Sequence, residues 1–144
     1  MRYALLVYYD PNADISAEER SRRAAGLESV PMRLRALGAR IDGLDAGLRL
    51  QPPTTAVTVR CWDGGDVMVS PGPAATAREQ LAACFVVGCP DAEAAVEAAT
   101  RIPAAWYGSV EVRPVVDEPA QLRPAFRPTA GGAELAAATA PAAS

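Results

Sequence analysis

The chain has 144 residues, half of them hydrophobic, and a formal net charge of −3. This length suits one domain that buries roughly two thirds of the surface of its unfolded chain, and no apolar run approaches the ~20 residues that span a bilayer. No basic stripe interleaved with aromatic residues is present, so neither a nucleic-acid partner nor a membrane partner is expected. Met1 leads directly into a strand-like segment rather than a signal peptide, which predicts a soluble, cytoplasmic protein.

The residue types that hold metals and cofactors are scarce. The chain has no His, and Cys61, Cys84 and Cys89 show no CxxC spacing, so we expect free thiols and no metal site. Cys84 and Cys89 lie in an apolar run and read as small buried hydrophobes. No phosphate-binding loop is present either, and we expect no cofactor.

Residues 2–9, "RYALLVYY", form a β-rich apolar run that ends at an Asp-Pro-Asn turn. Ser16 and Glu19 make a capping box that opens a helix running to about Leu37, and Pro31 predicts a kink or a break within it. Residues 39–44, "ARIDGL", read as a short strand. Residues 47–55, "GLRLQPPTT", read as a connecting loop, because paired prolines cannot donate to a sheet.

The second half repeats this strand and helix order after a hairpin. Residues 56–62 and 66–70 flank an Asp-Gly-Gly turn, which predicts a β-hairpin. Residues 81–89 form a strand, Asp91 caps a helix that ends before Pro103, and residues 108–115 form the last strand. The order β-α-β, hairpin, β-α-β predicts an α+β, ferredoxin-like sandwich over residues 1–116 with an inserted hairpin.

The last segment, residues 117–144, is rich in Pro, Ala and Gly and poor in large apolar side chains, which predicts a mobile C-terminal tail. In the domain itself, helices on one side of a single sheet leave the other sheet face apolar and uncovered. We therefore expect a homodimer in which two sheets face each other.

Four segments occur in the order seen in a known family: "LQPPTTAVTVR" (50–60), "REQL" (78–81), "TRIPAA" (100–105) and "GSVEVRPV" (108–115). Over about residues 1–116 the chain thereby resembles the DGPF-type branch of the YCII-related proteins. The resemblance implies a dimeric α/β barrel of ferredoxin-like topology, a fold for which many members have no assigned function.

The signature of that branch is altered in this chain. Where the branch has Asp-Gly-Pro-Phe-Ala-Glu-Thr-Lys-Glu, residues 71–79 read "PGPAATARE", which retains Gly72, Pro73, Ala75 and Glu79 and places Arg78 at the Lys. The wider group often uses a His-Asp pair, and this chain lacks His. Loss of the polar and aromatic side chains widens and de-charges a pocket for a bulkier ligand, or reflects drift in a loop without chemistry; both interpretations stay open.

Alternation along the strands places polar side chains on shared faces. Tyr8, Arg60 with Trp62, and Glu111 with Arg113 converge on one cavity if these faces line a barrel. Without His, acid–base work falls to carboxylates and tyrosines. The candidate catalytic residues are Glu79, Glu111 and Tyr8, and the candidate substrate-binding residues are Arg60, Trp62, Gly72, Pro73, Arg78, Tyr107 and Arg113. For Glu111 and Arg113 we favour a structural ion pair that closes the sheet over a catalytic role. Arg78 and Glu79 beside the signature turn are better functional candidates, and a solvated loop end is an equally good interpretation of them.

Two function classes remain. One is a small cofactor-independent enzyme of specialised, natural-product metabolism that cyclises, isomerises or dehydrates an aromatic or polyketide-like intermediate in a hydrophobic cavity, with a cofactor-free oxygenase as a variant. The other is a non-catalytic, small-molecule-binding or accessory protein of the same fold. They differ in whether Glu79 and the strand carboxylates point into an enclosed cavity. The enzyme is our expectation, on the analogy of related folds.

Overall fold

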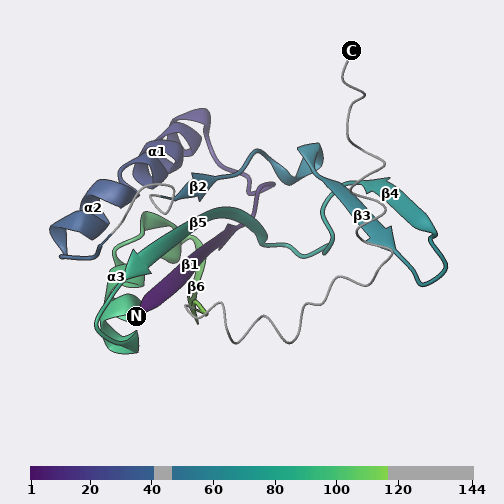
Figure 1. Cartoon of the computed structure of the whole chain (residues 1–144). Helices are drawn as coiled ribbons and strands as arrows, with labels where there is room; N and C mark the ends of the chain where they lie inside the picture. The colour runs from purple at the N-terminus through teal and green to yellow at the C-terminus, as the bar shows by residue number, and fades with distance from the viewer. Residues whose placement is uncertain (41–46, 117–144) are drawn as a thin grey trace, which may run out of the picture.

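The computed structural model describes residues 1–40 and 47–116. The helices are α1 (Ala17–Glu28), α2 (Val30–Ala36) and α3 (Ala92–Thr100), with short 3-10 turns η2 (Pro53–Thr55) and η3 (Pro103–Trp106). The strands are β1 (Arg2–Tyr9), β2 (Leu48–Arg49), β3 (Val57–Cys61), β4 (Val67–Pro71), β5 (Gln80–Gly88) and β6 (Gly108–Pro114). This order, shown in Figure 1, confirms the predicted α+β class.

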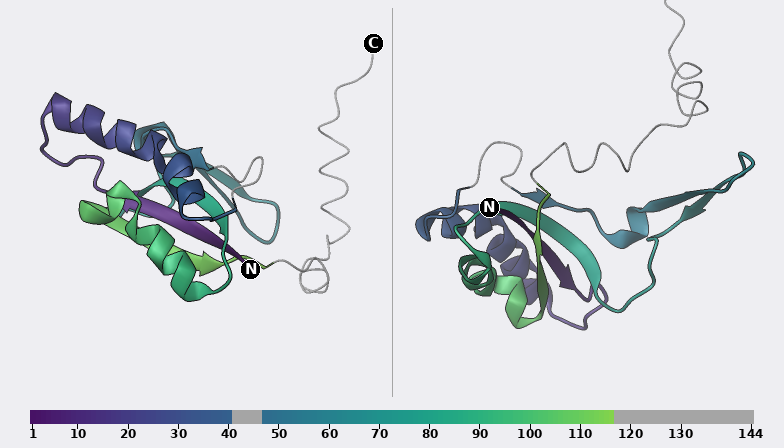
Figure 2. Two further views of the ribbon diagram at one scale, coloured as in Figure 1. Left: turned by 90° about the vertical axis from the view of Figure 1, so that its left-hand side faces the viewer. Right: turned by 60° about the horizontal axis from the view of Figure 1, so that its bottom comes forward.

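Four strands form the main sheet in the order β2-β5-β1-β6, and every neighbouring pair is antiparallel. With the hairpin set aside, this order is compatible with the expected ferredoxin-like topology. The helices cover one face of the sheet, and the hairpin β3-β4 projects from the opposite end of the molecule as a separate two-stranded sheet (Figures 1 and 2).

The core lies between the helices and the covered face of the sheet. Along β1 the side chains of Tyr3, Leu5 and Val7 are buried, as strand alternation predicts, and Phe85 and Val87 of β5 lie beside them. Leu34 of α2 is also fully buried. Full burial of a side chain of this size contributes about 1.5–3 kcal/mol, so these contacts fix the helices on the sheet.

The predicted helix ends are confirmed. The Ser16 hydroxyl accepts a hydrogen bond from the Glu19 amide (3.1 Å), and the Asp91 carboxylate accepts one from the Ala94 amide (2.8 Å). Pro31 stands in the first turn of α2, where its missing N–H costs nothing, so the predicted break falls at Ser29 between α1 and α2.

The prediction of a loop over residues 47–55 is wrong at Leu48 and Arg49, which form β2 against Cys84 and Ala83. Gly47 has a φ of +106°, and a Cβ on it would lie 2.1 Å from the Phe85 ring, so a glycine is needed for the chain to enter the sheet there. A strand was expected over residues 39–44. Within it, Arg40 forms an isolated β-bridge to Gly88, and residues 41–44 lie outside the described residues.

The expected tail over residues 117–144 also lies outside the described residues. Among the described residues, no helix combines the length and the apolar character that crossing a membrane requires.

Candidate functional site

A cavity of about 240 Å³ lies between α1, the end of β1 and the segment that follows β2. Its apolar wall is formed by Tyr9, Ile15, Leu27, Leu50, Pro52 and Leu81. Its polar groups come from Asp10, Arg20, Arg23, Gln51 and Gln80. An apolar cavity with a few polar side chains is the usual composition of a small-molecule site.

Helix α1 presents one face to this cavity. Arg20, Arg23, Ala24 and Leu27 all line it, and their spacing of three and four residues places them on one side of a helix. The Ser16 cap fixes where the helix starts and therefore where this face points. An ion pair between Arg49 and Glu28 (3.0 Å) ties the opposite wall, the segment at β2, to the end of the same helix.

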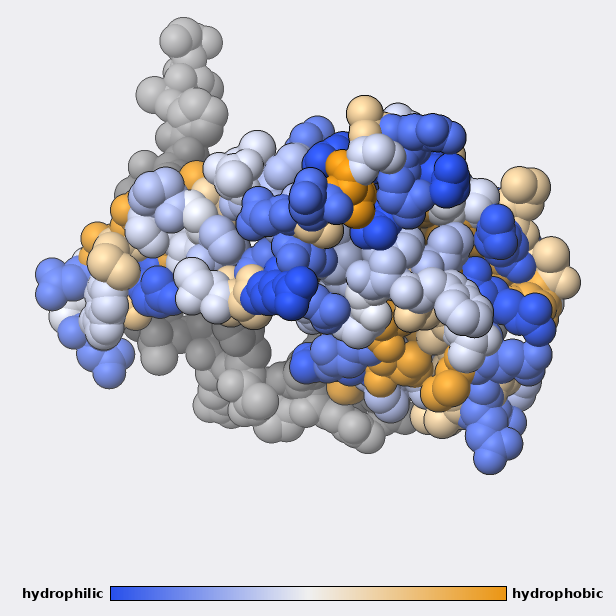
Figure 3. Space-filling model, turned by 180° about the vertical axis from the view of Figure 1, so that it is seen from behind, coloured by the Kyte–Doolittle hydropathy of each residue, from blue (hydrophilic) through white to orange (hydrophobic). Residues whose placement is uncertain are grey.

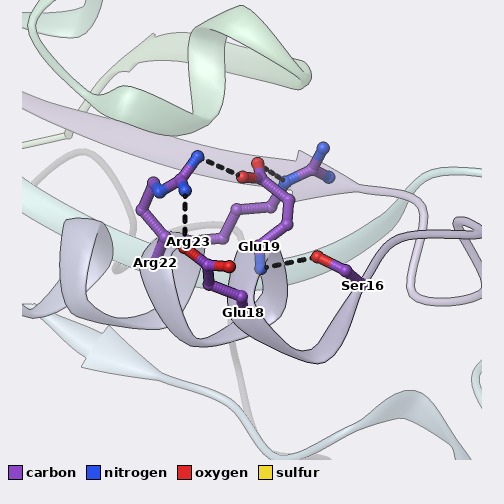
Figure 4. A network of polar contacts seen from close by, with 5 residues as sticks. All are labelled: Ser16, Glu18, Glu19, Arg22 and Arg23. Carbon is purple, nitrogen blue, oxygen red and sulfur yellow. Dashed lines mark hydrogen bonds and ion pairs between the residues drawn. The ribbon is translucent and has the colours of Figure 1, made fainter.

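Arg23 is held in a fixed position. Glu19 accepts hydrogen bonds from Arg23 Nε (2.9 Å) and Arg22 Nη1 (2.8 Å), and Arg22 also reaches Glu18 (Figure 4). The hydrogen bond from Arg23 holds the pKa of Glu19 below its usual value. The Arg23 guanidinium also stacks over the ring of Tyr107, 4.1 Å from its centre, which is a cation–π contact.

Arg20 differs from Arg23 because, among the described residues, it makes no ion pair. The cavity therefore has one guanidinium whose charge is neutralised by Glu19 and one that is available to a ligand. Arginine binds carboxylates and phosphates through paired N–H donors. The arrangement favours a ligand that combines an apolar body with a negatively charged group.

Tyr9 lines the cavity, and Tyr107 packs behind Tyr9 and Arg23 without lining it. Tyr9 and Tyr107 meet edge to face, with ring centres 6.0 Å apart. The Tyr107 hydroxyl is buried and has no hydrogen-bond partner among the described residues. Burial raises the pKa of Tyr107, so the hydroxyl stays protonated at neutral pH and is a free donor. A buried donor without a protein partner is uncommon in folded proteins.

The last two residues of the signature loop (residues 71–79) contact groups next to the cavity. Arg78 donates to Asp10 (3.0 Å), and this contact, with the Asn12 amide, lowers the pKa of the Asp10 carboxyl. Glu79 accepts a hydrogen bond from the Ser109 hydroxyl (2.7 Å). Arg78 and Glu79 thus fix the loop to β1 and β6 beside the cavity, but neither side chain lines it.

The other predicted site residues lie elsewhere. Glu111 pairs with Arg113 on the uncovered face of β6, and Tyr8 of β1 is half-buried on the same face. Arg60 donates to the Ala74 carbonyl (3.2 Å) on the projecting hairpin, which also carries Trp62, and Gly72 and Pro73 form the turn that follows β4. A single chain therefore does not bring Tyr8, Arg60, Trp62, Glu111 and Arg113 to one cavity. Two predicted residues contact cavity side chains: Tyr107 lies against Arg23, and Arg78 pairs with Asp10.

Sequence reasoning missed Arg20, Arg23, Gln51 and Gln80. The first two were detectable from their spacing with Ala24 and Leu27 along a helix whose start was already identified. For Gln51 and Gln80, which come together from segments far apart in the chain, no local pattern exists. Across residues 1–40 and 47–116 no three carboxylate or thiol side chains lie close enough to hold a metal ion.

The YCII-related domain family matches residues 1–119 of this sequence. The chain belongs to this family. An uncharacterized protein of Rhizobium meliloti (strain 1021) is 33% identical over 119 residues, which cover 80% of this chain and 92% of the relative. The predicted membership in the wider YCII-related family is thus confirmed, and the match spans every described strand and helix.

Proposed function

We propose that this YCII-related protein binds a small organic anion in the cavity beside α1. The observation that carries the proposal is the Arg20 guanidinium, which has no ion pair among the described residues and lines a mainly apolar cavity. The ligand's apolar body lies against Leu27 and Leu50, and its carboxylate or similar group accepts hydrogen bonds from Arg20. Gln51 and Gln80 lie in the same wall and supply further polar contacts.

The size of the cavity narrows the ligand. At about 240 Å³ it falls below the ~300–1,000 Å³ of pockets that hold drug-sized ligands. A single ring or a short branched chain that carries one acidic group fits this volume better than the bulkier, less polar ligand that the altered loop suggested. We further propose that this protein is a divergent member of the DGPF-type branch with a degenerate signature loop. We also propose that it forms a homodimer, in which the sheet faces that the helices leave uncovered meet as in a dimeric α/β barrel.

Acid–base catalysis on the bound anion is the second candidate, and Tyr107 favours it. Its hydroxyl is buried without a partner among the described residues, and its ring lies under Arg23, which lines the cavity, although Tyr107 itself does not. In a cofactor-independent cyclisation, isomerisation or dehydration, such a donor protonates or hydrogen-bonds a developing oxyanion. Glu79 and Glu111 do not line this cavity, so the enzyme hypothesis no longer depends on them.

Titration calorimetry with matched probes tests the proposal. Phenylacetate and its neutral counterpart phenylacetamide differ only in charge, and we expect the carboxylate to bind at least about tenfold more tightly, since a hydrogen bond to a charged group contributes about 1.5–3 kcal/mol. Arg20→Gln removes this preference, whereas Arg35→Gln, which deletes the same charge on α2, leaves it intact.

Equal binding of the two probes, or an unchanged preference in Arg20→Gln, contradicts the anion proposal. A panel of aromatic and branched aliphatic carboxylates that gives no heat and no thermal shift at millimolar concentration contradicts it as well. The catalytic candidate is tested separately: Tyr107→Phe retains the binding of a turned-over substrate and loses the turnover.

A further inference from the structure

The polar side chains that line the cavity beside α1 differ in the hydrogen bonds that they can make. Viewed from behind, hydrophilic residues are spread over the molecule and separated by apolar patches, so on this face no single polar surface attracts a charged ligand (Figure 3). Selection of a polar ligand therefore depends on the individual groups in the cavity. These groups lie on two walls, α1 on one side and the junction of β1 and β5 on the other.

The α1 wall offers only hydrogen-bond donors. Arg20 and Arg23 are the polar side chains that α1 contributes to the cavity, and a guanidinium donates hydrogen bonds but cannot accept them. Glu19, which pairs with Arg23 (Figure 4), does not line the cavity. The side chains of this wall therefore match the acceptor groups of a ligand and leave its donors without a partner.

The opposite wall offers acceptors. Asp10 follows Tyr9 at the end of β1, and Gln80 opens β5 directly opposite Tyr9, so the strand register brings two polar side chains of the cavity together. Hydrogen bonds from Arg78 and from the Asn12 amide hold the pKa of Asp10 below its usual value, so its carboxyl is ionised at neutral pH. An ionised carboxylate accepts hydrogen bonds and cannot donate them.

The amide of Gln80 is fixed in one orientation. Its Nε2 donates to the carbonyls of Ala77 (2.6 Å) and Ala75 (3.2 Å) in the signature loop, which uses both N–H groups of the amide. Its carbonyl oxygen Oε1 has no hydrogen-bond partner among the described residues. Gln80 therefore offers a ligand an acceptor. The Gln51 amide both donates and accepts, so it fits a ligand group of either kind.

Asp10 keeps the capacity for a further hydrogen bond. Its Oδ1 accepts from the Asn12 amide and its Oδ2 from Arg78, and each carboxylate oxygen has room for a second donor. Arg78 does not line the cavity, and its side chain is 88% exposed while that of Asp10 is 20% exposed. An ion pair with so exposed a partner is weak, so the carboxylate still attracts a cation in the cavity.

We propose that the ligand of this cavity is an α-amino acid with an apolar side chain, its carboxylate bound by Arg20 and its amino group by Asp10 and Gln80. The inference rests on the anion site proposed above and adds the second polar group of the ligand. An ammonium group fits better than a hydroxyl, because its several N–H donors serve both acceptors and a hydroxyl has a single donor. One cavity of about 240 Å³ holds both walls, so a small molecule reaches from one to the other.

Four probes that share one ring test the two polar groups independently. Phenylacetate, phenylacetamide, phenylglycine and phenylglycinamide carry or lack the carboxylate and the amino group in every combination, and titration calorimetry measures the affinity of each. We expect one enantiomer of phenylglycine to bind at least about tenfold more tightly than phenylacetate, because the added contact is to a charged group. The other enantiomer gains less, since ring, carboxylate and amino group each contact a different part of the cavity. Mandelate, which has a hydroxyl in place of the amino group, also gains less.

Three variants locate the contact of the amino group. Asp10→Asn keeps the shape of the side chain, removes its charge and abolishes the gain of phenylglycine over phenylacetate. Asp14→Asn removes the same charge from an exposed residue that does not line the cavity, and the gain is unchanged. Arg78→Gln breaks the ion pair of Asp10 but keeps its carboxylate, so the gain persists. This last variant separates a contact with the ligand from an effect through the signature loop.

Three results overturn the amino-acid inference: neither enantiomer of phenylglycine binds more tightly than phenylacetate, mandelate equals or exceeds phenylglycine, or Arg78→Gln loses the gain together with Asp10→Asn. If phenylacetate still binds more tightly than phenylacetamide, the anion proposal stands without the amino group. Equal binding of phenylglycine and phenylglycinamide, both tighter than phenylacetate, contradicts the anion proposal and leaves the amino contact. Absence of binding for all four probes overturns both.

Discussion

Tyr107 joins three features of the site in one side chain. Its ring lies under the Arg23 guanidinium and against the edge of Tyr9, while its hydroxyl is buried without a partner among the described residues. The ring contacts stabilise the folded chain, and the unpaired hydroxyl opposes them because a buried polar group without a hydrogen bond loses its hydration. The residue is positioned for something other than stability alone.

Removing this hydroxyl is therefore expected to stabilise the protein. Tyr107→Phe keeps the ring contacts and should raise the free energy of unfolding by about 1 kcal/mol at neutral pH. Because the pKa of Tyr107 is raised by burial, the unfolded tyrosine loses its proton first as the pH passes 10, and the wild type loses stability there. Urea denaturation at neutral and alkaline pH measures both effects. The control is Tyr8→Phe, on the face of the main sheet that the helices leave uncovered. The interpretation is contradicted if Tyr107→Phe is less stable than the wild type and loses free energy of unfolding at alkaline pH to the same extent.

At the scale of elements, α1 connects local sequence to the cavity. Its first turn is set by the Ser16 cap, its charges are ordered by Glu19, and its inner face contributes Arg20, Arg23 and Leu27 to the site. A change that frays the first turn therefore moves groups that touch a ligand, although the substituted residue lies outside the cavity.

Ser16→Ala tests this connection. Loss of an N-cap costs about 1 kcal/mol, so the Tm should fall, and fraying at Glu19 and Arg20 should weaken phenylacetate binding. Ser21→Ala, on the exposed part of the same helix, lacks the cap contact and serves as the matched control for both measurements. If Ser16→Ala lowers the Tm and leaves the affinity for phenylacetate unchanged, the cap does not position the cavity face.

Most elements were predictable because each one carries its own local signal. Strands β1 and β5 have long apolar runs, and β6 alternates valines with polar residues. Helices α1 and α3 have caps at Ser16 and Asp91, and Pro31 marks the break before α2. Strand β2 was missed because Leu48 and Arg49 carry no periodic pattern of their own; their pairing depends on Cys84 and Ala83, more than thirty residues away. The contact of Arg78 with Asp10 is of the same kind, so sequence identified these residues separately and the fold joined them.

At the scale of the whole molecule, the helices cover one face of the main sheet and leave the other face uncovered. The covered face is a packed core, while the hairpin β3-β4 exposes Val57, Val59, Val67 and Val69 to solvent. The four hairpin valines are 59% to 64% exposed, and exposed apolar side chains that lie together commonly mark an interaction surface. The homodimer proposed above would cover these side chains.

Coupling between association and folding makes thermal stability depend on protein concentration. When two folded copies separate and unfold together, a tenfold rise in concentration adds about 1.4 kcal/mol to the free energy of unfolding, which raises the Tm of a pair of this size by about 4 °C. Differential scanning calorimetry over a hundredfold concentration range measures the slope. Val69→Glu should reduce the dependence of the Tm on concentration, and Met68→Glu should preserve it. Val69 lies on the apolar face of the hairpin β3-β4, whereas Met68 lies on its other face. A wild-type Tm that does not change with concentration would show that each copy folds without the other, and the uncovered surfaces would then have to be stable in water by themselves.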